Sequence, residues 1–255
     1  MSDLILTRRD DNGVAYVAFN RADKRNALNI PLLQGLCAAV EGFNADEGVR
    51  VIVLGGEGPT FCAGLDMAEA QDPERAHASA ELIARGLRAL YHSPKVTIAR
   101  VQGGAIAGGC GFMTACDLSV VEVGAKLGYP EVRRGMVAGL VMTFLARQVG
   151  ERHARELLLT GEIIDGERAE AIGLVNRAVP SDTLDQYVNR YIEQVLLGAP
   201  GAIRRTKAFY DAIRPFHVDK DIDLALGLHV EVRNSAEAQE GMRAFTEKRV
   251  PGWQA

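Results

Sequence analysis

Two segments rich in glycine and other small residues could bind a developing negative charge through their backbone. They are 58–67 (GPTFCAGLDM) and 102–112 (QGGAIAGGCGF), and each follows a predicted buried strand, at 49–54 and at 95–101. The carboxyl ends of parallel strands are where α/β proteins commonly bind ligands. Glycines there let a ligand approach the main chain and leave N–H groups exposed. A helix is predicted to begin at Gly108, so that its N–H, with a second N–H nearby, would form an oxyanion hole.

The same glycines also allow close packing between a helix and a strand. For either segment alone, packing is the better interpretation. The occurrence of two such segments after successive strands favours a ligand site.

Motifs for nucleotide, nucleophile and metal chemistry are absent. No GxGxxG or GxSxG occurs, and Gly109 stands where a phosphate-binding loop requires lysine. The five histidines have no zinc-site spacing and no two of the four cysteines form a CxxC pair. The sequence therefore predicts no metal and no separate cofactor. Cys110, beside the second segment, is interpreted as a buried packing thiol rather than a nucleophile.

The elements that must position these segments alternate along the first part of the chain. Strands are predicted at 13–19, 49–54 and 95–101, from β-branched and continuous apolar runs. Helices are predicted at 30–44 and 73–91, from apolar residues at helical spacing. This order predicts an α/β core with parallel strand pairing.

After a short strand at 118–123, the sequence becomes mostly helical. Candidate helices are 139–149, 151–160, 166–172, 182–197, 200–213, 218–234 and 236–248. The predicted organisation is a core over residues 1–198 and a helical C-terminal portion over 199–255.

Composition and charge exclude several classes of protein. The chain has 255 residues, 47% of them hydrophobic, and a formal net charge of −4. This acidic balance argues against nucleic-acid binding. No apolar run is long enough to span a bilayer, and the first residues lack the pattern of a signal peptide. A cytoplasmic location is expected.

Taken together, several motifs resemble the crotonase superfamily, the enoyl-CoA hydratases and isomerases. They are NRADKRNALN (20–29), FCAGLD (61–66), VQGGAIAGGC (101–110) with Cys116-Asp117, YPEVRRG (129–135), and matching runs at 158–176 and 238–249. Each motif is weak alone, but their joint order over roughly residues 5–250 is specific.

The resemblance implies a spiral of ββα repeats, assembly as a homotrimer or homohexamer, and an acyl-CoA thioester as substrate. It assigns the oxyanion hole to the N–H groups of Leu65 and Gly108, in agreement with the backbone argument above. The substrate-binding positions that it implies are Lys24, Arg25, Ala27, Ala63, Asp66, Met67, Gly111 and Leu140. Lys24 and Arg25 suit CoA phosphates by charge, although a solvated loop pair is nearly as good an interpretation of either alone.

Catalytic carboxylates decide the chemistry within this superfamily. Hydratases usually carry two glutamates, of which the second matches Glu131 and the first falls on Gly111. Isomerisation needs one base, which removes an α-proton and returns it at the γ-carbon. Glu131 is therefore the expected acid/base, although it could instead be a surface glutamate at a helix start. The apolar residues at 136–141 favour a pocket.

Other residues could modify this prediction. Bulky residues at 139–143 replace the Gly-rich turn of many hydratases and should reshape the acyl pocket. Asp66, Glu69 or Glu122 could compensate for Gly111, although Asp66 is interpreted as structural. Three hypotheses follow: an enoyl-CoA isomerase or hydratase, a thioester hydrolase or decarboxylase on the same scaffold, and a catalytically idle acyl-CoA-binding protein.

Overall fold

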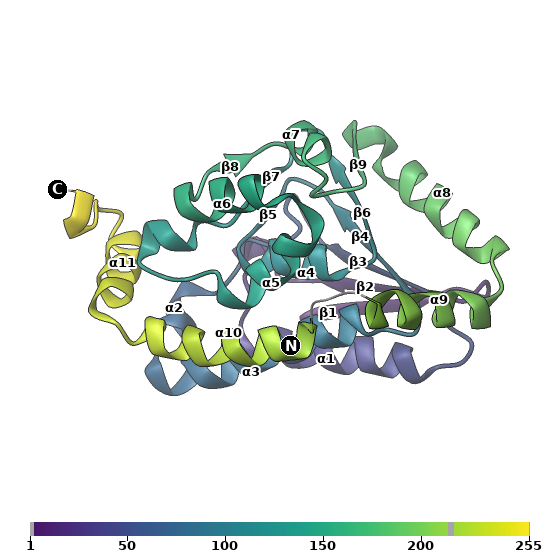
Figure 1. The fold of residues 1–255 in the computed structure, drawn as a ribbon, viewed down its shortest axis with the longest axis horizontal. Coiled ribbons are helices and arrows are strands. Elements are labelled where there is room, and N and C mark those ends of the chain that lie inside the picture. Colours follow the sequence, from purple (N-terminus) through teal and green to yellow (C-terminus); the bar gives the residue numbers. More distant parts are fainter. Residues whose placement is uncertain (1–2, 214–216, 255) are drawn as a thin grey trace.

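A six-stranded sheet runs through the centre of the molecule (Figure 1). The computed structural model describes residues 3–213 and 217–254. In order across the sheet, the strands are β1 (Ile5–Arg9), β2 (Val14–Phe19), β3 (Val51–Gly56), β4 (Val96–Val101), β6 (Leu118–Glu122) and β9 (Arg177–Val179). All neighbouring pairs from β2 to β9 are parallel, while β1 pairs antiparallel with β2. The predicted parallel α/β core is confirmed.

A second sheet of three short strands lies beside the first. It contains β5 (Gly104–Ile106), β7 (Lys126–Gly128) and β8 (Ile163–Ile164). The chain passes from β4 into β5 and then α4 (Gly108–Ala115), and from β6 into β7 and then the 3-10 helix η2 (Pro130–Arg134) and α5 (Gly139–Gln148). This alternation between the two sheets before α4 and again before η2 and α5 is the ββα repeat that the resemblance implies.

Helices cover both faces of the large sheet. The remaining ones are α1 (Ile30–Ala45), α2 (Met67–Ala70), α3 (Pro73–Tyr91), α6 (Glu151–Thr160), α7 (Gly166–Ala171), α8 (Leu184–Leu197), α9 (Pro200–Ala212), α10 (Val218–Arg233) and α11 (Ala236–Thr246), with 3-10 turns η1 (Ala22–Lys24), η3 (Ser181–Thr183) and η4 (Gly252–Gln254). One face packs on α1, α3 and α4 in the main core, and the other packs on α8.

Local sequence explains why the helices begin and end where they do. At the start of α1, the Asn29 side chain accepts a hydrogen bond from the Leu32 N–H at 3.1 Å, and Pro31 occupies the first turn. Helix α6 ends at Gly161, whose φ of +63° is the left-handed conformation that glycine tolerates. Such signals let the sequence predict α3 and α6 with the bounds observed. It did not predict β1 or the short strands of the second sheet.

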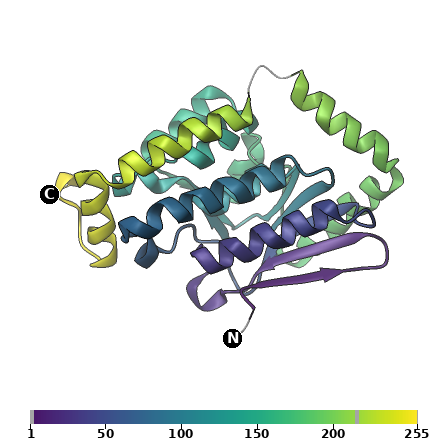
Figure 2. The ribbon, with the colours of Figure 1, turned by 90° about the horizontal axis from the view of Figure 1, so that it is seen from below.

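The last helices fold back over the first half of the chain. Helix α10 packs on α3 and α5, and Figure 2 shows α1, α3 and α10 side by side. Helix α11 packs on η2 and α2. The predicted helices at 200–213, 218–234 and 236–248 are confirmed apart from their final residues. The connection at 214–216 lies outside the described residues.

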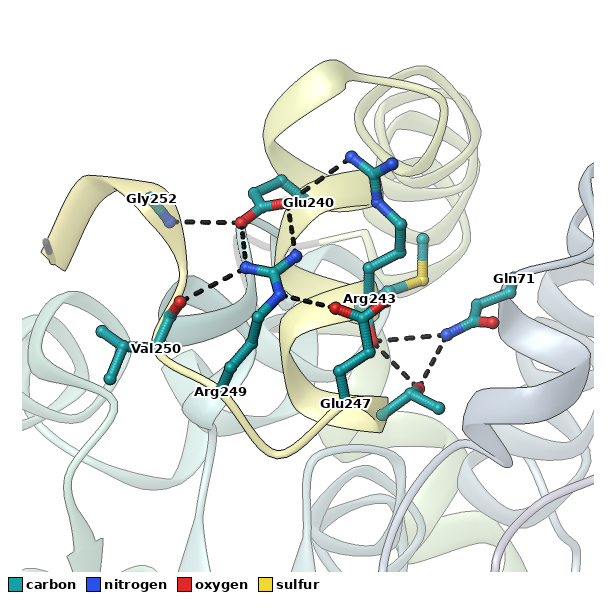
Figure 3. Close-up of polar contacts among 9 residues, drawn as sticks. Gln71, Glu240, Arg243, Glu247, Arg249, Val250 and Gly252 are labelled. Atoms are coloured by element: carbon teal, nitrogen blue, oxygen red, sulfur yellow. Dashed lines mark hydrogen bonds and ion pairs between the residues drawn. The ribbon is translucent and has the colours of Figure 1, made fainter.

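A polar network holds the residues after α11 against that helix (Figure 3). Glu240 accepts hydrogen bonds from the Arg249 guanidinium at 2.6 and 2.9 Å and from the Gly252 N–H at 3.2 Å. Gln71, at the end of α2, donates to the Thr246 hydroxyl at 2.7 Å. These contacts fix α11 and the chain after it relative to the first half of the molecule.

Candidate active site

A cavity of about 280 Å³ opens beside the two Gly-rich segments. Among the residues that line it are Lys24, Arg25, Ala27, Ala63, Leu65, Asp66, Met67, Gly108, Glu131 and Leu140. These are all the site positions that the sequence predicted except Gly111. The structure therefore gathers residues from four distant segments onto one wall.

Two hydrogen bonds to Leu28 hold the residues on either side of Leu65 in place. The Leu28 N–H donates to the Gly64 carbonyl at 2.8 Å, and the Asp66 N–H donates to the Leu28 carbonyl at 3.0 Å. In a parallel bridge of this kind, the intervening N–H points away from the partner strand. The Leu65 N–H donates no hydrogen bond to any residue of 3–213 or 217–254, so it is available to a ligand.

The Gly108 N–H lies at the first residue of α4. The preceding residue, Ala107, has φ +51° and ψ −115°, an uncommon conformation for a residue with a side chain. Its own N–H donates to the Gly128 carbonyl at 2.8 Å, which holds this turn in place. Within the described chain, the Gly108 N–H donates no hydrogen bond. The turn therefore leaves this N–H free at a helix N-terminus.

The two Gly-rich segments touch each other at Gly64. This residue has φ +86°, and a Cβ built on it would lie 2.8 Å from the Ile106 carbonyl oxygen and 3.6 Å from the Gly108 nitrogen. Only glycine permits this approach. The glycines therefore serve both roles considered from the sequence. They allow the two segments to pack closely, and this packing brings Leu65 and Gly108 to the same cavity.

Glu131 contributes a carboxylate from the η2 turn. Its side chain is buried, with 8% of the residue exposed, and its Oε2 has no hydrogen-bond partner in the described chain. Burial raises the pKa of Glu131 to about 7, although the nearby Arg134 charge acts in the opposite direction. A carboxyl group with this pKa can both accept and donate a proton near neutrality.

The loop that carries Lys24 and Arg25 is organised by Asn26. This residue has φ +55° and is fully buried. Its amide nitrogen donates to the carbonyls of Glu57 and Thr60 at 2.9 and 2.8 Å, and its oxygen accepts from the Arg21 N–H at 2.8 Å. Asparagine tolerates the left-handed conformation, and it stands inside the first motif. Asn26 was nevertheless not among the predicted site residues.

Asp66 has a structural part in the cavity wall. Its carboxylate forms a salt bridge with Arg21 at 2.5 Å and accepts from the Ala68 N–H at 3.0 Å, which caps α2. Burial acts to raise the pKa of Asp66, but these hydrogen bonds and the Arg21 charge lower it overall. The carboxylate is therefore held by Arg21 and by the start of α2, which agrees with a structural role for Asp66.

The other candidate replacements for the missing glutamate do not reach the cavity. Glu69 accepts from the Ile30 N–H at 2.8 Å, and Glu122 accepts from the Gly103 N–H at 2.8 Å. Neither lines the cavity.

Cys110 is buried, its thiol donates to the Ala105 carbonyl at 2.8 Å, and burial raises its pKa. These contacts agree with a packing role for Cys110.

Gly111 is the one predicted site residue that the structure does not bring to the cavity. It lies within α4, and the space beside its Cα is filled by Val141 of α5. Val141 and Leu140 line the cavity in its place.

Several cavity residues lay outside the sequence prediction of the site. They include Ile83 from α3, Arg134 from η2, His229 from α10 and Phe245 from α11. Burial lowers the pKa of His229 to about 4, and its Nε2 has no hydrogen-bond partner in the described chain. The Arg134 guanidinium lies over the Phe245 ring, 4.2 Å from its centroid. His229 and Phe245 could not be found from local sequence, because α10 and α11 bring them to the cavity from far along the chain.

The described residues contain neither a metal-binding cluster nor a membrane-spanning helix. Over residues 3–213 and 217–254, no group of three His, Cys, Asp or Glu side chains could hold a metal ion. Within the same ranges, no helix combines the length and the apolar character needed to cross a bilayer.

The fold and the cavity together define an α/β protein in which two backbone N–H groups without a partner in the described chain and a buried carboxyl group line one cavity. The profile of the family described as Enoyl-CoA hydratase/isomerase matches residues 9–255. The chain belongs to this family, and solved structures of enoyl-CoA hydratases share its crotonase fold.

Particular relatives show how far the similarity extends. A Thermus thermophilus protein, provisionally described as an enoyl-CoA hydratase, is 39% identical over 93% of this chain and 96% of its own length. The (E)-benzylidenesuccinyl-CoA hydratase of Thauera aromatica is 32% identical over 97% of this chain and 98% of its own. The crystal structure of an enoyl-CoA hydratase from Mycobacterium avium has a TM-score of 0.88 and 32% identity, covering 99% of this chain and 100% of that one.

Proposed function

We propose that this enzyme moves the double bond of 3-enoyl-CoA thioesters to the 2-position, with Glu131 as its acid/base. One observation carries the proposal: Glu131 is the only carboxylate on the described cavity wall with a buried, unpartnered oxygen. Of the other acids on that wall, Asp66 is paired with Arg21 and Asp23 is exposed. Isomerisation needs one proton-transfer group, and the cavity supplies one.

The proposed reaction consists of two proton transfers. The Glu131 carboxylate removes a proton from C2, and the electrons move into the thioester to form a dienolate. The N–H groups of Leu65 and Gly108 stabilise the oxygen that gains negative charge. Glu131 then delivers the proton to C4, and the double bond forms between C2 and C3. The carboxylate is regenerated, so that no water or cofactor is consumed.

The substrate orientation follows from the charged residues at the cavity rim. Lys24 and Arg25 are exposed on the η1 loop and line the cavity. They would bind the CoA phosphates, and the chain from Ala63 to Met67 would lie along the pantetheine arm. The acyl group would then extend past Glu131 toward Leu140 and Val141.

Hydration of a 2-enoyl-CoA is the second candidate function. The relatives described above carry hydratase names, and His229, whose Nε2 has no hydrogen-bond partner in the described chain, also lines the cavity. In this reaction, Glu131 would take a proton from water as the water oxygen attacks C3, and would then return that proton to C2 of the resulting enolate. His229 would orient that water in place of a second glutamate.

A substrate panel distinguishes these functions. The purified protein is incubated with hex-3-enoyl-CoA, hex-2-enoyl-CoA and a malonyl-type thioester, and the products are separated. Isomerase activity gives the conjugated thioester from the first substrate and is lost in Glu131→Gln. A 3-hydroxyacyl product supports hydration, free CoA supports hydrolysis, and carbon dioxide supports decarboxylation. Binding of CoA without turnover of any substrate would support an idle binding protein.

We also propose assembly into a homotrimer or homohexamer in the cytoplasm, with residues 199–255 as the assembly and lid region. In support, Phe209 and Ile213 at the end of α9 are 67% and 61% exposed. Apolar groups exposed to this degree favour contact with another surface. Light scattering of the purified protein, and of a variant with serine at both positions, tests the assembly.

A further inference from the structure

Arg134 is a cation on the cavity wall that lacks an anionic hydrogen-bond partner. It forms no salt bridge and donates no hydrogen bond within residues 3–213 and 217–254. Two other partly buried arginines are engaged differently: Arg147 is paired with Asp221, and Arg21 with Asp66. Arg134 differs from them because it lines the cavity without such a partner.

The position of Arg134 is tied to that of Glu131. They are residues i and i+3 of η2, and side chains with this spacing in a 3-10 helix lie one above the other. Three residues of such a helix span about 6 Å. Both residues line the cavity. A group bound by Arg134 would therefore lie within a few carbon atoms of the carbon that Glu131 deprotonates.

No acidic side chain of the described residues forms a salt bridge with Arg134, although the Glu131 charge acts on it. Burial lowers its pKa, and the Glu131 charge opposes this effect. Its other close neighbour is the Phe245 ring, which attracts a cation but accepts no salt bridge. A partly desolvated guanidinium with open donors binds a carboxylate strongly, because two parallel N–H groups match its two oxygens.

We propose that Arg134 binds a carboxylate on the acyl group, so that the preferred substrates are CoA monothioesters of short dicarboxylic acids. This inference rests on the proposed enoyl-CoA chemistry of Glu131. A CoA phosphate is the other anion available, but the whole pantetheine arm separates it from the reacting carbon. Lys24 and Arg25 supply exposed cations for the phosphates at the rim.

Binding tests the inference without requiring turnover. Adipoyl-CoA and hexanoyl-CoA have the same number of acyl carbons and differ by one carboxylate. Calorimetric titration of the wild-type protein should show tighter binding of adipoyl-CoA. In Arg134→Gln this preference should fall by about 10- to 100-fold, as expected for a lost charged hydrogen bond. Arg134→Lys, which keeps the charge, should restore part of it.

Arg133→Gln is the matched control. Arg133 neighbours Arg134 in η2 but is exposed and donates to the Thr160 carbonyl at 2.9 Å. This variant should keep the wild-type preference. If Arg134→Gln weakens both ligands and free CoA equally, Arg134 contacts the CoA portion and the inference is wrong. Equal wild-type affinities for the two ligands would also overturn it.

Turnover separates this inference from the proposed function. Hex-3-enedioyl-CoA and hex-3-enoyl-CoA are compared by the absorbance of the conjugated thioester. A higher kcat/KM for the diacid, lost in Arg134→Gln, supports both proposals. Isomerisation of both substrates with a ratio that Arg134→Gln leaves unchanged supports the function and overturns the inference. A binding preference without isomerisation of either substrate supports the inference and overturns the function.

Discussion

The side chain of Val141 fills the space beside the Cα of Gly111. A Cβ built on Gly111 would overlap Cγ1 of Val141, and it would also lie 3.6 Å from Leu87 Cδ2. Gly111 is the position where the resemblance expects a second catalytic glutamate. The absence of a side chain at position 111 therefore leaves the space that Val141 occupies where α4 packs on α5.

Restoring the glutamate requires a change at both positions. Gly111→Glu alone should destabilise the protein by about 1–3 kcal/mol, because the new side chain overpacks against Val141. Adding Val141→Gly should recover part of this loss, as measured by urea unfolding of the single and double variants. The double variant should also hydrate hex-2-enoyl-CoA faster than the wild type. Strictly additive effects on stability would contradict the proposed steric coupling.

The proposed isomerase activity should depend on the ionisation of Glu131. Because the carboxylate is the proposed base and its pKa is about 7, kcat/KM should reach a plateau above that pH and fall about tenfold per unit below it. Arg134→Gln removes a positive charge that lowers this pKa, so that the acidic limb should move to higher pH. Initial rates with hex-3-enoyl-CoA across the pH range provide the measurement. A limb that stays in place would show that Arg134 does not act on Glu131.

Glu131 should cost the enzyme stability at alkaline pH. Its pKa in the folded chain lies above the ordinary 4.5, so the folded state binds the proton more tightly than the unfolded state. Stability should therefore fall as the pH rises from 4.5 to 7. Glu131→Gln removes this penalty and should be more stable than the wild type at pH 8, by at most about 3 kcal/mol. The free energies of unfolding should converge below pH 4.5, and a constant difference at both pH values would refute the linkage.

Asn26 should stabilise the loop that carries Lys24 and Arg25, the proposed CoA-binding residues. Asn26→Ala removes two hydrogen bonds from a buried amide, to the carbonyls of Glu57 and Thr60, and a side chain suited to a left-handed backbone. We expect a loss of about 2–4 kcal/mol of stability and a higher KM. Asn12→Ala, on an exposed turn, is the control and should change neither. Unfolding curves and steady-state kinetics provide both measurements. An unchanged KM in Asn26→Ala would show that this loop does not contribute to substrate binding.

Lys24 should contribute to CoA affinity through charge. Lys24→Glu should raise the Kd for CoA by several-fold at low salt, and the difference should shrink as salt screens the exposed charge. Lys220→Glu, exposed on α10, makes the same change of net charge away from the cavity. Titrations at two ionic strengths compare the variants. Equal effects of the two substitutions would attribute the change to the overall charge of the protein.

Local sequence was sufficient to predict most of the longer strands and helices and to place the two Gly-rich segments at strand ends. Buried parallel strands are continuous apolar runs, and capped helices carry local signals, so that 49–54 and 73–91 could be predicted from nearby residues alone. The segments around Leu65 and Gly108 could be placed for the same reason. A chain that leaves a parallel strand and bends at glycines exposes its N–H groups in a predictable place.

The tertiary structure decided which side chains complete the cavity. Val141, His229 and Phe245 reach it because α5, α10 and α11 pack against elements far away in the sequence. Arg134 stands in a predicted motif, but its lack of a carboxylate partner becomes visible only when all its neighbours are placed. Packing and electrostatic pairing depend on distances between segments, and these distances are set by the whole fold rather than by local sequence.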